Sequence, residues 1–78
     1  MEIKINRFIS CFSEQFEETD ISEFSATTEF HQLEEYSSLV ALSIMAMIDE
    51  EYDVQLKAEE MRNANTIQDL FDLVQSHL

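Results

Sequence analysis

The sequence predicts an all-α protein, a four-helix bundle with three longer helices, one short third helix and a long first connection. Three observations predict this class. Apolar side chains recur at spacings of three and four residues over most of the chain, which is the period of a helix with one buried face. A polar stretch without that period follows the first helix. The 78 residues, 45% of them apolar, suffice for one core, so residues 1–78 are expected to form a single domain.

The first helix is expected over residues 2–17, where one stripe contains Ile5, Phe8, Ile9, Phe12 and Phe16. Residues 18–36 lose this period and are rich in Ser, Thr, Asp and Glu, whose side chains bond to nearby backbone groups. A loop of this length in a small domain is often functional. Three apolar residues are expected to anchor it to the bundle, namely Phe24, Phe30 and Leu33.

The second helix is expected over residues 38–52, with Ser37 or Ser38 capping its first turn. One stripe of this helix is apolar and contains Ala41, Ile44, Met45, Ile48 and Tyr52. The other side is apolar at its start and acidic at its end, and contains Leu39, Ser43, Ala46 and Glu50. Either this helix is simply the most buried one, or its excess apolar surface docks onto a partner.

Two further helices complete the bundle. Residues 57–64 suit a short helix, with three residues expected to face inward, Ala58, Met61 and Ala64. Thr66 and Asp69 have the spacing of a capping pair, which predicts a last helix over residues 67–77. Its apolar stripe contains Ile67, Leu70, Phe71 and Val74.

The charge of the chain restricts its partners. Seventeen Asp and Glu oppose four Lys and Arg, which gives a formal net charge of -13. Such a surface should repel nucleic-acid phosphate and anionic lipid, so we expect neither as a partner. It should attract proteins with basic patches, and added salt should weaken that attraction.

Other site types have little support in the sequence. Cys11 is the only cysteine, so an internal disulfide is excluded, and it is expected to be half-buried on the first helix. His31 and His77 are far apart in the sequence, so no metal site is expected. The N-terminal residues do not resemble a signal peptide, and the nearly apolar stretch 39–48 is too short to span a bilayer. We therefore expect a cytoplasmic protein without membrane insertion.

Ser38 stands out at the junction between the long loop and the second helix. A phosphate ester at that position would lie where backbone N–H groups point outward and the helix dipole is positive. No His, Lys or Arg flanks the serine in sequence, so the pattern suits a residue modified by another enzyme better than a nucleophile. On this evidence alone, Ser38 is equally a simple helix cap.

The stretch from Phe30 to the C-terminus resembles the acyl carrier protein family. That family has an Asp-Ser-Leu motif at the start of its second helix, and Ser38 and Leu39 match its Ser-Leu. The acidic and aromatic end of the second helix also fits the family, with Asp49, Glu50, Glu51 and Tyr52. The short acidic helix fits with Leu56, Glu59 and Glu60, and the start of the last helix fits with Thr66 and Ile67. The resemblance implies that Ser38 bears a covalent 4′-phosphopantetheine arm derived from coenzyme A.

Two departures from the family pattern bear on specificity. Ser37 replaces the Asp of the motif, which leaves two adjacent serines; Ser38 is favoured because Leu39 follows it, and Ser37 is then expected to cap the helix. Val40 and Ser43 occupy positions that are often acidic in fatty-acid carriers. The resemblance therefore implies a carrier for a specialised pathway, similar to bacterial carriers with Tyr or Trp before the motif.

The resemblance implies a carrier and not an enzyme. A phosphopantetheinyl transferase would attach the arm, and acyl-transferring or ketoacyl synthase-type enzymes of fatty-acid-like, lipid or polyketide biosynthesis would act on the tethered acyl group. Docking is expected at Leu39, Val40, Ser43, Ala46 and Glu50. The acyl chain is expected to shelter among Ile44, Ile48, Tyr52, Leu56, Met61 and Leu70, and the carrier is expected to be a monomer. Two alternatives stay open, a peptidyl or aryl carrier and an acidic helical adaptor without an arm.

Overall fold

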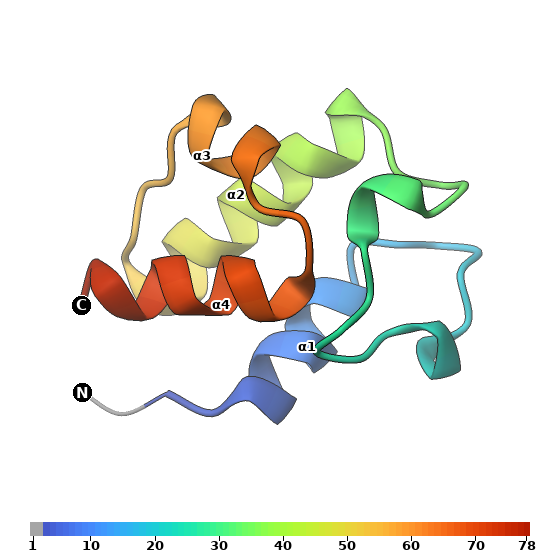
Figure 1. Cartoon of the computed structure of the whole chain (residues 1–78), viewed down its shortest axis with the longest axis horizontal. Coiled ribbons are helices and arrows are strands. Elements are labelled where there is room, and N and C mark those ends of the chain that lie inside the picture. Colours follow the sequence, from blue (N-terminus) through green and yellow to red (C-terminus); the bar gives the residue numbers. More distant parts are fainter. Residues whose placement is uncertain (1–2) are drawn as a thin grey trace.

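The computed structural model describes residues 3–78 and confirms the all-α class. Its elements are α1 (Ile5–Ser13), the 3₁₀ turns η1 (Ile21–Glu23) and η2 (Phe30–Gln32), α2 (Ser38–Tyr52), α3 (Ala58–Asn63) and α4 (Ile67–Ser76). Helix α1 packs against both α2 and α4, and the long connection curves around one end of the bundle (Figure 1). No helix within the described residues is long and apolar enough to cross a membrane.

The core is aromatic at the end of the bundle where the long connection packs. The ring of Phe12 has its centroid 5.4–6.4 Å from those of four other phenylalanines, Phe8, Phe16, Phe24 and Phe30. The predicted anchoring of the connection is confirmed for Phe24 and Phe30, which are buried, while Leu33 is partly buried against the core. Cys11, expected to be half-buried, is instead buried.

Helix α1 is shorter than the prediction of residues 2–17. It begins at Ile5 and ends at Ser13, and residue 2 lies outside the described residues. The chain tightens directly after the last turn, because the amides of Gln15 and Phe16 donate to carbonyl groups three residues back instead of four. The next three amides, those of residues 17–19, donate to the carboxylate of Glu35, so they are not available to resume the helix. Phe16 nevertheless stays buried beyond the last turn.

The predicted bounds of the second helix are confirmed, because α2 runs from Ser38 to Tyr52. Ser37 has extended backbone angles and its hydroxyl oxygen accepts a hydrogen bond from the N–H of Val40 at 3.3 Å, which is an N-cap. At the other end Asp53 adopts a left-handed conformation with φ of 56°. Glycine usually takes this position, but the sequence has none, and Asp tolerates it better than most other residues.

Helix α3 occupies six residues between two extended stretches, slightly less than the predicted 57–64. Its start is capped because the carboxylate of Glu60 accepts a hydrogen bond from the N–H of Lys57 at 3.0 Å. Met61 and Ala64 are buried as predicted. The prediction that Ala58 faces the core was wrong: as the first residue of the helix it is exposed, at the rim of a surface groove.

Helix α4 begins with the predicted capping pair. The hydroxyl of Thr66 accepts from the N–H of Asp69, and the carboxylate of Asp69 accepts from the N–H of Thr66, both at 3.1 Å. The long connection completes this cap, because its carbonyl groups at Thr28 and Ala26 accept from the next two amides, those of Ile67 and Gln68, at 3.1 and 2.9 Å. The helix ends at Ser76, one residue before the predicted end.

Candidate functional site

Ser38 is the first residue of α2, and its side chain is exposed. The adjacent Ser37 supplies the capping hydroxyl, so the two serines have different surroundings. Within residues 3–78 the Ser38 hydroxyl makes no hydrogen bond, and it is therefore available for a covalent bond at the positive end of a 15-residue helix.

A groove of about 350 Å³ adjoins Ser38, and α2, α3 and the long connection form its walls. Helix α2 contributes Ser38, Ala41, Leu42 and Met45; α3 contributes Ala58, Met61 and Arg62; and the connection contributes His31 and Tyr36. Most of these side chains are apolar, so an apolar chain or a pantetheine-sized arm could contact the wall while Ser38 lies at its edge.

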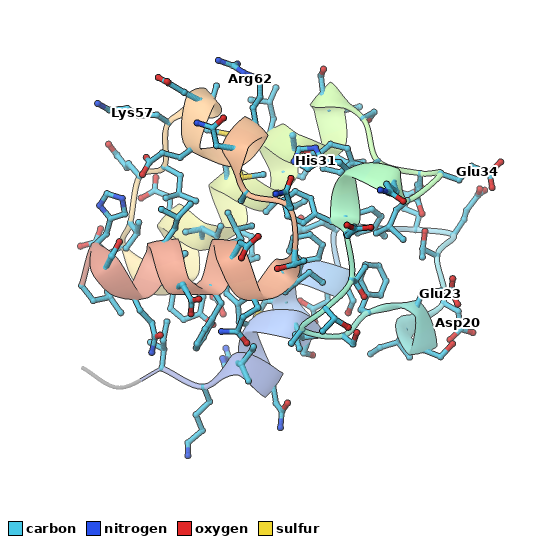
Figure 2. The ribbon with its side chains drawn as sticks, in the orientation of Figure 1. Asp20, Glu23, His31, Glu34, Lys57 and Arg62 are labelled. Carbon is cyan, nitrogen blue, oxygen red and sulfur yellow. The ribbon has the colours of Figure 1, made fainter. Side chains whose placement is uncertain are left out.

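His31 links the long connection to α3. Its Nε2 atom lies 3.1 Å from the carbonyl oxygen of Met61 and 2.8 Å from that of Ala64. Carbonyl oxygens only accept, so Nε2 must carry a proton and donate it. The imidazole also stacks on Phe30, with ring centroids 4.5 Å apart. Figure 2 shows His31 reaching from η2 toward α3, so this side chain joins two of the walls of the groove.

Glu35 fixes the segment that leads into the two serines. Its carboxylate accepts four hydrogen bonds of 2.7–3.0 Å, from the amides of Glu17, Glu18 and Thr19 and from the Thr19 hydroxyl. The bond from the Thr19 hydroxyl, together with those from the amides, lowers the pKa of the Glu35 carboxyl. No local pattern in the sequence indicates this role of Glu35, because its partners lie far away along the chain.

The residues predicted to dock partners lie along one side of α2, but not all are equally exposed. Leu39 is 75% exposed, Ala46 and Glu50 are exposed, and Val40 and Ser43 are half-buried. The prediction missed Leu42, which is 62% exposed. Its spacing of three residues from Leu39 was the available signal, since side chains three apart share a helix face.

The six predicted acyl-pocket residues all lie in the core. Ile44, Ile48 and Leu70 are completely buried, and the other three, Tyr52, Leu56 and Met61, are 2–7% exposed. Met61 is the one member that also lines the groove at Ser38. The residues around Ser38 thus belong to a surface groove, while the remaining candidates pack inside the bundle.

No cluster of His, Cys, Asp and Glu suited to a metal ion occurs in the part of the chain that the structure describes. A comparison with protein families matches residues 6–74 to a family model described as a phosphopantetheine attachment site. The matched range includes Ser38, the groove and most of all four helices, so it extends the resemblance into the first helix. In a comparison with curated proteins, none matched the chain.

Proposed function

The chain belongs to the phosphopantetheine-binding carrier family, whose members bear a covalent 4′-phosphopantetheine, and we propose that Ser38 is the residue that bears it here. One observation supports this assignment most strongly. The Ser38 hydroxyl is exposed and makes no hydrogen bond within residues 3–78, whereas the Ser37 hydroxyl caps α2. Modification of Ser37 would therefore cost the helix its cap.

The surroundings of Ser38 fit a phosphodiester and a long arm. The first turn of α2 favours negative charge, and no acidic residue of α2 lies in that turn. The adjacent groove offers an apolar wall to the arm. When attached, the arm supplies a terminal thiol that holds the cargo as a thioester. Ser38 would bear the phosphate. The Ser37 hydroxyl caps the first turn of α2, and the Glu35 carboxylate fixes the segment that precedes the two serines.

We infer that the cargo is an acyl group of fatty-acid-like, lipid or polyketide biosynthesis. Tethering would raise the concentration of this group at each partner enzyme without requiring tight binding. The partners, a phosphopantetheinyl transferase and acyl-transferring or ketoacyl synthase-type enzymes, would dock on α2. The exposed Leu39 and Leu42 offer apolar contact there, and Glu50 offers charge near the end of the helix.

Mass spectrometry of the intact protein tests the attachment. The purified chain is incubated with coenzyme A and a broad-specificity transferase, and one pantetheine addition is expected. Ser38→Ala should abolish it. Ser37→Ala should retain it, although loss of the cap should cost about 1 kcal/mol of stability. Addition to Ser38→Ala, or no addition with the transferase of the native organism, would contradict the assignment.

Loading of the carrier with its phosphopantetheine attached distinguishes acyl cargo from aminoacyl or aryl cargo. When this form of the protein is offered to activating enzymes of each class, it should accept acyl groups most rapidly. Preferential loading by an enzyme that activates amino acids or aryl acids would identify a peptidyl or aryl carrier instead. Membership of the family argues against an adaptor that works without an arm.

A further inference from the structure

The groove at Ser38 differs in charge from the rest of this acidic surface. Three other hollows of the described structure are each lined by three Asp or Glu side chains. The groove at Ser38 is lined by none, and it contains Arg62 and His31. In a chain with a formal net charge of -13, the hollow beside the candidate attachment point is therefore better suited to an anion than these three are.

Arg62 is the lining residue of this groove that carries a permanent positive charge. Its guanidinium is exposed and forms no ion pair with any residue from 3 to 78, whereas Arg7 pairs with Glu51 at 2.8 Å. His31 already donates its Nε2 proton to the carbonyl groups of Met61 and Ala64, the residues that flank Arg62. These bonds hold the last turn of α3, and hence the backbone of Arg62, at the groove (Figure 2).

We propose that Arg62 binds an anionic group of the arm and its cargo, with the phosphodiester at Ser38 as the first candidate and a cargo carboxylate as the second. This inference rests on attachment at Ser38. Arginine suits either anion, because its planar guanidinium can form two parallel hydrogen bonds to phosphate or carboxylate oxygens. Arg62 would then be a positioning residue, which holds the arm along the groove between visits to partner enzymes.

The experiment compares the protein with and without its arm in three forms: wild type, Arg62→Gln and Lys57→Gln. Lys57 is the matched control, because it precedes the same helix and carries the same charge but does not line the groove. NMR records the Nε–Hε signal of Arg62 and the ³¹P signal of the phosphodiester, and thermal denaturation gives Tm. In wild type and Lys57→Gln, attachment of the arm should shift the Arg62 signal and raise Tm by about 2–4 °C. In Arg62→Gln the rise in Tm should be lost, and the ³¹P signal of the attached arm should move from its position in wild type, whereas Lys57→Gln should leave that position unchanged.

Loaded forms identify which anion is bound. A shift of the Arg62 signal in the form with a free thiol assigns the phosphodiester. A shift that appears only after loading with a carboxyacyl group, and not with a neutral acyl group, assigns the cargo carboxylate. An unchanged Arg62 signal in all forms, or equal losses in Arg62→Gln and Lys57→Gln, overturns the proposal. A protein that accepts no arm overturns the assignment of Ser38 as well, and the intact mass shows this before any spectrum is recorded.

Discussion

Glu35 shows how one side chain can determine the local path of the backbone. Its carboxylate accepts hydrogen bonds from the amides of residues 17–19, shortly after the end of α1, and it fixes the chain three residues before Ser38. Glu35→Gln removes the negative charge that these donors require, so we expect a lower midpoint of urea denaturation at pH 7. Circular dichroism at increasing urea concentration measures this midpoint.

The pH dependence of that loss follows from the lowered pKa of Glu35. The carboxylate stabilises the fold above its ordinary pKa of 4.5, and this stabilisation disappears as pH falls through the lower pKa of the folded protein. The difference between wild type and Glu35→Gln should therefore shrink in acid. Glu34→Gln is the control, since it removes the same charge from an exposed neighbour. Equal effects of the two variants would contradict the role of Glu35.

Tyr52 carries a polar group that the core does not satisfy. Its hydroxyl is buried without a hydrogen-bond partner in the described structure, and desolvation raises its pKa. Its ring packs on Phe8, with centroids 5.8 Å apart. Because Tyr52→Phe keeps the ring and removes the unpaired hydroxyl, we expect it to raise the free energy of unfolding by about 1 kcal/mol. A measured loss of stability would show that the hydroxyl has a partner in solution.

At the scale of elements, α3 depends on its neighbours. Six residues are too few for a helix that is stable alone. His31 holds the end of this helix, and His77, the residue that follows α4, has its Nε2 atom 3.0 Å from the carboxylate of Glu60. His31→Phe keeps an aromatic ring against Phe30 but loses the bonds to α3, so we expect a loss of about 1–2 kcal/mol. Hydrogen exchange should quicken at the amides of α3, and unchanged exchange there would contradict this role.

The exposed apolar side chains of α2 lead to a prediction about docking. Leu39→Ala and Leu42→Ala should leave stability nearly unchanged, because both side chains are largely exposed. If partners cover them, each truncation should weaken binding to the transferase by about tenfold. Ile21→Ala is the matched control, since Ile21 is 65% exposed on η1 away from α2. Calorimetry measures the affinities, and equal effects of all three variants would contradict docking on α2.

Helix starts that depend on residues close by in the chain were predictable from the sequence. Helices α2 and α4 begin at the predicted residues because Ser37 and Thr66 cap them through nearby amides. The path of the chain just beyond α1 was not predictable, since it depends on Glu35, a distant partner. The same reason limits the site: the position of Ser38 follows from the motif and helix start, whereas the groove and the place of Arg62 arise only when α3 packs beside α2.

At the scale of the whole molecule, the net charge of -13 should make salt act in two opposite directions. Raising the salt concentration from 0.15 to 1 M shortens the screening length from about 8 to about 3 Å. Repulsion among the carboxylates then weakens, so Tm should rise by several degrees, while attraction to basic partners should fall. Differential scanning calorimetry and binding titrations at both concentrations measure these effects. A fall in Tm would contradict the first expectation.

The hydrogen bonds between the long connection and the start of α4 have a consequence for folding. The first turn of α4 donates two amide hydrogen bonds to the carbonyl groups of Ala26 and Thr28, which lie far from it in the sequence. The last helix therefore cannot complete its start until the connection is in place. A connection of this length would otherwise open by itself at little cost in free energy. Here its opening also frays α4, so the loop and the C-terminal helix should melt as one cooperative unit.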